Sequence, residues 1–197
     1  MLRVDHVGYA VADLDEAARR WRREFGLDSA PGGRHADWGT ANRIVPLGDQ
    51  YVELIAVADA DEARGSRFGR SVLERVSAGD GWFVVVVATD DLDAEASRLE
   101  LETSQGSRTR PDGTRLGWRS AGFEDDRREP WMPFFIEWTT SPDLHPGRTR
   151  AGHGIRVEGI SRIEIAGDED RLRAWLGGRD LPIRVVDGTA GSARSRS

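Results

Sequence analysis

Three side chains that can carry a proton or bind a cation lie in segments predicted to be β-strands. These segments are rich in β-branched and aromatic residues, and they contain His6, Glu53 and Glu137. Strand side chains alternate between two faces, so each glutamate shares its face with mainly apolar neighbours. The neighbours are Tyr51 and Ile55 on one strand and Phe135 and Thr139 on the other. An unpaired buried carboxylate needs a cation, a hydrogen-bond donor or a raised pKa, which makes both glutamates candidates for acid–base chemistry or cation binding.

The composition excludes several classes of chemistry. The 197 residues contain no cysteine, and all 28 basic residues are arginine. Disulfides, thiolate metal sites, cysteine nucleophiles, Schiff-base lysines and the phosphate-loop lysine are therefore excluded. The formal net charge of -6 provides no basic surface for a phosphate backbone, so nucleic acid is not an expected partner. The sequence also has no nucleophile elbow, no His-Glu-x-x-His motif and no dinucleotide-binding glycine fingerprint.

No segment is expected to enter a membrane. The first residues lack the long apolar core of a secretory signal, and the longest apolar run, residues 82–88, is too short to span a bilayer. Together with the absence of cysteine, this favours a soluble, cytoplasmic protein. We expect it to act on a small molecule as a monomer or a homodimer.

Residues 1–60 are predicted to form a first module of a strand, a helix and further strands. Asp13 can cap a helix over residues 14–25, and Gly26 can end that helix in the left-handed conformation. Residues 30–35 are rich in glycine and proline and are expected to form a turn. The strands are expected at residues 3–11, 41–47 and 51–57.

Residues 81–141 are predicted to repeat this order as a second module. The sequence Asp91-Leu92-Asp93 opens its helix and matches Asp13-Leu14-Asp15 of the first module. Residues 61–80 form the connection between the modules, with an amphipathic helix at 66–76. The strands of the second module are expected at residues 82–89, on both sides of the turn at 111–114, and at 133–139.

A shorter third unit follows at residues 155–187. It is predicted to be a strand at 157–165, a helix capped by Asp168, and a strand at 181–186. Residues 188–197 consist mainly of glycine, serine and arginine and are expected to be disordered. The predicted fold class is therefore α+β, with two tandem βαβββ modules and a C-terminal βαβ appendage.

Several motifs resemble those of the glyoxalase-like domain family in the vicinal oxygen chelate superfamily. They are Asp5-His6-Val7 in the first strand, the segment Gly32-Gly33-Arg34-His35-Ala36-Asp37-Trp38-Gly39-Thr40-Ala41-Asn42-Arg43, Tyr51-Val52-Glu53-Leu54, and Phe134-Phe135-Ile136-Glu137-Trp138. The superfamily includes glyoxalase I, extradiol dioxygenases and bleomycin-resistance proteins. The resemblance implies paired curved antiparallel sheets, each half of an open barrel, with a cleft on the concave face.

The resemblance also implies a site for one divalent ion in the cleft. The matching ligand positions are His6, Glu53 and Glu137, a donor set that suits zinc, manganese, iron(II), cobalt or nickel. The second module departs from the pattern, because the position of a second histidine falls among side chains that cannot bind a metal. These are Trp82, Phe83, Val84 and Val85. A metal-free site, in which Glu53 pairs with an arginine, is the alternative reading.

Two functions follow from these two readings. One is an enzyme that acts on a small oxygenated metabolite, as a metal-dependent lyase or isomerase or as a dioxygenase, with Glu53, Glu137 and His35 as catalytic residues. The other is a metal-free protein that binds or sequesters an aromatic ligand, as bleomycin-resistance proteins do. Strand alternation groups His6 with Val4 and Gly8, away from the helices.

Further candidate residues surround the expected cleft. His35 is placed in a mobile, glycine-rich loop, where it either reaches the cleft mouth or is a surface histidine. The arginine pairs Arg108 with Arg110 and Arg115 with Arg119 either clamp a carboxylate or form a solvated face. The histidines of the later loop, His145 and His153, are read as structural or exposed. The candidate substrate-binding residues are Trp38, Asn42, Arg43, Trp118 and Arg119.

Overall fold

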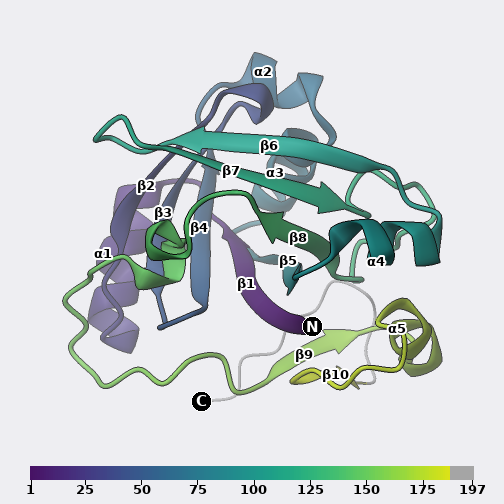
Figure 1. Cartoon of the computed structure of the whole chain (residues 1–197). Coiled ribbons are helices and arrows are strands. Elements are labelled where there is room, and N and C mark those ends of the chain that lie inside the picture. The colour runs from purple at the N-terminus through teal and green to yellow at the C-terminus, as the bar shows by residue number, and fades with distance from the viewer. Residues whose placement is uncertain (187–197) are drawn as a thin grey trace.

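Eight strands form one closed barrel in the computed structural model, which describes residues 1–186 (Figure 1). The order of strands around the barrel is β1-β4-β3-β2-β6-β7-β8-β5. Their bounds are β1 (Leu2–Ala10), β2 (Ala30–His35), β3 (Thr40–Pro46), β4 (Tyr51–Val57), β5 (Gly81–Thr89), β6 (Thr103–Thr109), β7 (Arg115–Ala121) and β8 (Phe134–Trp138).

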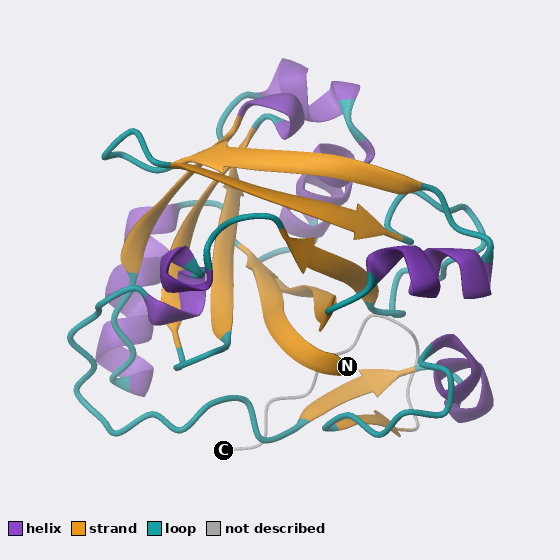
Figure 2. Ribbon diagram, in the orientation of Figure 1, coloured by secondary structure: helices purple, strands orange, loops and turns teal. Residues whose placement is uncertain are grey.

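The helices lie outside the barrel wall, and the expected mixed α+β class is confirmed (Figure 2). One helix follows the first strand of each half, so the order of strand, helix and three strands occurs at β1–β4 and again at β5–β8. Two helices connect the halves. The bounds are α1 (Leu14–Phe25), α2 (Ala60–Gly65), α3 (Arg67–Ser77) and α4 (Leu92–Leu99).

No helix within residues 1–186 is long and apolar enough to cross a membrane.

Helix α1 begins and ends at the residues expected from the sequence. The side chain of Asp13 accepts hydrogen bonds from the backbone N–H groups of Asp15 and Glu16, which have no partner within the helix. Gly26 ends the helix with a φ of 67°, in the left-handed region. The buried face of α1 presents Trp21 to the barrel wall.

The strand pairing differs from the expected antiparallel sheets. Strand β1 pairs in parallel with β4, and β5 pairs in parallel with β8, while β1 and β5 are antiparallel to each other. The barrel is closed on its other side by one residue pair between β2 and β6, Arg34 with Thr109. These contacts join the two halves into a single barrel instead of two half-open sheets.

Residues 30–35 form strand β2 and not the expected turn. Gly32 explains the difference, because a Cβ atom at this position would lie 1.9 Å from Oδ1 of Asn42 on the neighbouring strand. The glycine here permits a close approach of two strands instead of a reversal of the chain.

A β-bulge in β1 changes which side chains face the interior. Val4 pairs with Val87 and His6 pairs with Val86, so Asp5 is an extra residue without an opposite partner. Val4 belongs to the core outside the barrel, whereas Asp5 and His6 are both directed to the interior. The expected grouping of His6 with Val4 is therefore wrong, because simple alternation breaks at the bulge.

The C-terminal unit is shorter than expected and packs on the outer core. It comprises β9 (Ile163–Ala166), α5 (Glu169–Trp175) and β10 (Ile183–Val186), and the two strands pair in parallel. Leu172 of α5 joins the core cluster that also contains residues of the barrel wall. The expected disorder of residues 188–197 concerns a segment outside the described residues.

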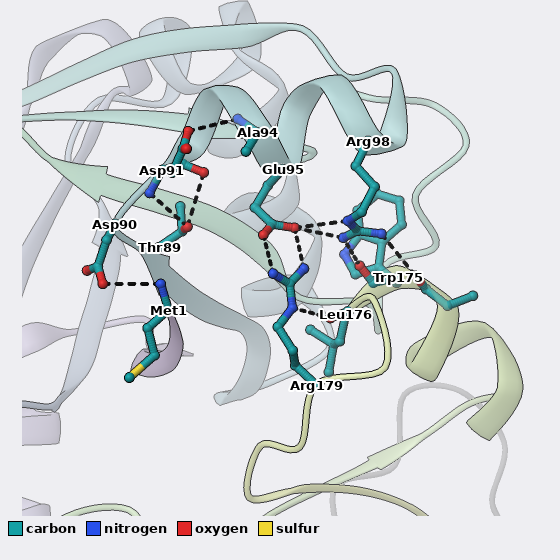
Figure 3. Close-up of polar contacts among 11 residues, drawn as sticks. Met1, Thr89, Asp90, Asp91, Ala94, Glu95, Arg98, Trp175, Leu176 and Arg179 are labelled. Atoms are coloured by element: carbon teal, nitrogen blue, oxygen red, sulfur yellow. Dashed lines mark hydrogen bonds and ion pairs between the residues drawn. The ribbon is translucent and has the colours of Figure 1, made fainter.

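Buried charge also joins this unit to the barrel. Figure 3 shows the carboxylate of Glu95, on α4, between the guanidinium groups of Arg98 and Arg179. Burial by itself would raise the pKa of Glu95, but the hydrogen bonds from Arg179 and Arg98 hold it below its usual value. The indole of Trp175 adds a hydrogen bond of 2.9 Å to the carbonyl oxygen of Pro133.

We predict that Leu172→Ala destabilises the whole protein. The side chain is 3% exposed and contributes to the shared core, so its truncation should cost about 2–5 kcal/mol of unfolding free energy. Chemical denaturation of the variant measures this loss. The matched control, Arg173→Ala, changes the exposed neighbour in the same helix and should have an effect below about 0.5 kcal/mol. Equal effects of the two substitutions would contradict integral packing of α5.

Candidate functional site

A narrow cavity of about 30 Å³ lies inside the barrel. This volume holds about two water-sized groups. Eight of its thirteen lining residues are apolar or aromatic, from both halves of the barrel and from α3. The other five are His6, His35, Tyr51, Glu53 and Arg108.

Asp5 is the buried acceptor beside this cavity. Its Oδ1 lies 2.6 Å from Nδ1 of His6, and its Oδ2 accepts hydrogen bonds from Nε1 of Trp138 (3.0 Å) and Nε2 of His145 (2.9 Å). Burial by itself would raise the pKa of Asp5, but the hydrogen bonds of His145 and His6 outweigh it and hold the pKa below its usual value. The carboxylate is therefore ionised.

An ionised Asp5 determines which ring nitrogens carry protons. A carboxylate can only accept, so His6 must donate from Nδ1 and His145 must donate from Nε2. Nδ1 of His145 in turn accepts the backbone N–H of Gly147 at 3.2 Å. His6 is thus left with Nε2 as its free ring nitrogen, on the side of the cavity.

Glu53 lies opposite this nitrogen. One carboxylate oxygen is 3.8 Å from Nε2 of His6, and the other is 3.8 Å from Nε2 of His35. Nδ2 of Asn42 donates to the second oxygen at 2.5 Å. The sequence-based expectation that His6 and Glu53 face a common interior is confirmed by these distances.

His35 is buried at the end of β2 and not in a mobile loop as expected. Its Nδ1 lies 3.0 Å from Oγ1 of Thr40. Burial lowers its pKa to about 4, although the charge of Glu53 acts in the opposite direction. His35 is therefore neutral at physiological pH.

Tyr51 and Arg108 complete the polar lining. The ring of Tyr51 stacks on His6 with 4.3 Å between ring centroids, and burial raises the pKa of the tyrosine well above its usual value. Burial lowers the pKa of Arg108, but an arginine remains charged even so. Nη1 of Arg108 donates to Oδ1 of Asn42 at 3.3 Å.

Glu137 does not reach the cavity, so the expected convergence of three ligands is wrong. It lies on the outer face of β8, where its carboxylate accepts hydrogen bonds from the N–H of Leu92 (3.3 Å) and from Arg119 (3.2 Å). The neighbouring Ile136 faces the cavity instead. Phe135, which shares the face of Glu137, packs in the outer core and fixes this orientation.

The five expected substrate-binding residues divide between the two faces of the wall. Trp38 and Trp118 line the cavity, and Asn42 contacts Glu53 from the inner face of β3. Arg43 points outward to Ser29 and Asp15, and Arg119 points outward to Asp93 and Glu137, so neither can touch a ligand in the cavity.

The donor set does not fit the divalent ion that the resemblance implies. Within the described part of the chain, no group of three His, Cys, Asp or Glu side chains is arranged to hold a metal ion. The physical reason is that β5 and β8 contribute Val84, Val86 and Ile136 to the cavity where further ligands would be needed.

Sequence reasoning missed three residues of this site. Asp5 was recognised only as part of a motif, and Tyr51 only as a neighbour of Glu53. His145 was read as structural or exposed, yet it contacts Asp5 from the turn between two 3₁₀ helices, Pro142–Leu144 and Pro146–Arg148. Its distance from Asp5 in the sequence leaves no local signal for this contact.

The fold and the site define a mixed α+β barrel protein with ionisable side chains around an internal cavity. The family model of the glyoxalase-like domain matches residues 4–178, and the chain belongs to this family. The expected membership of the glyoxalase-like domain family is thereby confirmed.

Two solved structures illustrate the similarity of fold. A hypothetical protein from Staphylococcus aureus aligns with a TM-score of 0.72 and 17% identity, over 96% of this chain and 88% of that one. Methylmalonyl-CoA epimerase from Mycobacterium tuberculosis aligns with a TM-score of 0.51 and 20% identity, over 72% of this chain and 90% of that one. At these identities the likeness concerns the fold alone. No curated protein sequence matches the chain.

We predict that Gly32→Ala destabilises the site. The added Cβ would lie 1.9 Å from Oδ1 and 2.7 Å from Cγ of Asn42, so the amide must leave Glu53 or the strands must separate, at a cost of about 1–3 kcal/mol. Chemical denaturation measures the change. Gly65→Ala is the control, because a Cβ there meets nothing within 4 Å and replaces a helical glycine. An unchanged unfolding free energy in Gly32→Ala would contradict this close packing of Gly32 against Asn42.

We also predict that buried His35 makes stability depend on pH. Its pKa is about 4 in the folded protein and 6.5 in the unfolded chain, so the unfolded chain binds the extra proton between these values. The unfolding free energy should therefore fall as pH falls from 6.5 towards 4, with a contribution of up to about 1.4 kcal/mol per pH unit. Urea titrations of the wild type and His35→Gln at several pH values measure this contribution. If the unfolding free energy of the variant changed with pH as steeply as that of the wild type, His35 would not be its cause.

Proposed function

We propose that this chain is an enzyme that moves a proton on a small oxygenated metabolite inside the barrel. The observation that carries this proposal is the Asp5–His6 pair facing Glu53 at 3.8 Å across the cavity. Both sides of this gap hold a group that can accept or donate a proton.

His6 has the geometry of a general base. Asp5 holds its Nδ1–H in a hydrogen bond of 2.6 Å, which fixes the ring and leaves the Nε2 lone pair on the cavity side. The developing positive charge on the ring is stabilised by the ionised carboxylate of Asp5. His145 and Trp138 hold that carboxylate in place through its other oxygen, so they are positioning residues.

Glu53 is the second proton-transfer group. Asn42 binds one of its oxygens, and the other faces His6. A substrate carbon or hydroxyl that lies beside both His6 and Glu53 can lose a proton to one and regain a proton from the other. This arrangement supports an isomerase or lyase reaction next to a carbonyl group, in which neighbouring neutral His35 and Tyr51 can donate hydrogen bonds to a substrate oxygen.

One observation favours binding without turnover as a second candidate. The cavity has many aromatic walls, with Trp38 stacked on Phe68 at 4.5 Å and Trp118 at 5.7 Å from Trp38. Such a lining suits a planar apolar ligand. A sequestering protein would keep its ligand affinity when His6 or Glu53 is replaced by a neutral amide.

We also interpret the two occurrences of strand, helix and three strands as tandem modules, each contributing half of the barrel. The first module supplies His6, His35, Tyr51 and Glu53, and the second supplies Arg108 and most of the apolar wall.

We predict that His6→Gln and Glu53→Gln abolish proton exchange. In D₂O, the wild type should incorporate deuterium next to the carbonyl of at least one compound from a panel of small 2-oxo and 2-hydroxy acids and aldehydes, as followed by proton NMR. Each variant should lower this rate by about 10²–10⁴-fold, because a positioned acid or base contributes that much. Glu137→Gln is the matched control and should retain the rate within about twofold, since that carboxylate lies outside the cavity.

Three results would count against the proposal. A full deuterium-exchange rate in Glu53→Gln would show that Glu53 takes no part in the reaction. Equal losses of this rate in Glu137→Gln and Glu53→Gln would show a general effect on folding. Ligand binding without exchange in the wild type would favour sequestration.

Elemental analysis of the same samples, purified without a histidine tag, tests whether the donor set fails to hold a divalent ion. One tightly held divalent ion per chain, lost in Glu53→Gln, would overturn that conclusion.

A further inference from the structure

We propose that Arg108 binds the carboxylate group of the ligand inside the barrel, so that the ligand is a small 2-oxo or 2-hydroxy carboxylic acid. The second part of this inference rests on the proposed function, because it names the class of substrate for the same site. The anion-binding role itself rests on the contacts of Arg108.

Arg108 is a buried cation with few partners. The residue is 3% exposed, and the one side-chain hydrogen bond that it forms within residues 1–186 is the 3.3 Å contact with Oδ1 of Asn42. No carboxylate oxygen of the same residues lies within 4 Å of its guanidinium nitrogens. A guanidinium has five N–H donors in a planar fork, so most of the donors of Arg108 have no acceptor in the described part of the chain.

A second buried arginine, Arg128, has backbone acceptors for Nη1, although its Nε has no hydrogen-bond partner among residues 1–186. Nη1 of Arg128, which is 7% exposed, contacts three backbone carbonyl oxygens, those of Glu129, Pro130 and Met132. The guanidinium of Arg108 has no such set of carbonyl acceptors and instead lines the cavity. Its free donors are therefore available to a ligand.

The free donors of Arg108 favour a carboxylate. A planar fork of N–H donors binds a carboxylate through two parallel hydrogen bonds. Gly32 helps to keep this place open, because a Cβ there would lie 2.8 Å from Nη1 of Arg108.

The position of Arg108 connects anion binding to the acid–base groups. Asn42 bridges Arg108 to Glu53, and Glu53 lies 3.8 Å from His6. A carboxylate held by Arg108 would place the next carbon of the ligand towards His6 and Glu53. That carbon bears the oxo or hydroxy group in a 2-oxo or 2-hydroxy acid, which is where the proposed proton transfer takes place.

Equilibrium binding of pyruvate and of its neutral amide, pyruvamide, tests the proposal without turnover. Calorimetry and the indole N–H signals of Trp38, Trp118 and Trp138 would report binding in the cavity. The wild type should prefer pyruvate by at least about tenfold, as expected for a charge-assisted pair of hydrogen bonds. Arg108→Gln should remove this preference and keep pyruvamide binding. Arg108→Lys, which retains the charge without the planar fork, should keep a smaller preference.

Arg115→Gln is the matched control, because it removes the same charge from an exposed arginine on the neighbouring strand and should leave the preference unchanged. An unchanged preference in Arg108→Gln, or no preference or no pyruvate binding in the wild type, would overturn the proposal. If Arg108→Gln fails to fold, the Nε–H signal of Arg108 in the wild type gives the answer: it should shift with pyruvate and not with pyruvamide. Glu53→Gln should keep the preference for pyruvate, so a failure of the catalytic proposal is distinguishable from a failure of this one.

Discussion

The site depends on one buried carboxylate that accepts hydrogen bonds from three side chains, two of them far away in the sequence. Asp5 bonds His6 beside it, Trp138 at the end of β8 and His145 in the turn that follows. A buried anion without these donors would be strongly disfavoured, and the donors without the anion would lose their common acceptor. The β-bulge that turns Asp5 inward is thus a requirement of the site, since regular alternation would place this carboxylate in the outer core.

The two halves of the barrel differ in the chemical character of their inner faces. The ionisable lining comes from β1, β2 and β4 in the first half, and from Arg108 alone in the second. Strands β5 and β8 present valine, phenylalanine and isoleucine at the positions that face His6 and Glu53. An apolar wall opposite a charged one lowers the local dielectric response, and it strengthens every hydrogen bond formed by a ligand in between.

Sequence patterns predicted the elements better than the directions of their side chains. The cap at Asp13 and the end at Gly26 follow from local chemistry, whereas the inward position of Glu53 follows from the family resemblance, and the structure agrees with all three. Glu137 shows the limit, because Phe134, Phe135 and Ile136 make both faces of β8 apolar and alternation alone cannot tell inside from outside. Asp5 and His145 show a second limit: a bulge and a contact across 140 positions leave no periodic signal.

The single residue pair that joins β2 to β6 has a consequence for the rate at which molecules can enter and leave. Every other junction around the barrel contains at least three paired residues, so separation at this seam breaks the fewest backbone hydrogen bonds. The paired residues, Arg34 and Thr109, are the immediate neighbours of His35 and Arg108, which both line the cavity. Transient separation of β2 from β6 would therefore widen the cavity next to Arg108. The lifetime of a bound molecule would then depend on how often the backbone hydrogen bonds between these two strands break.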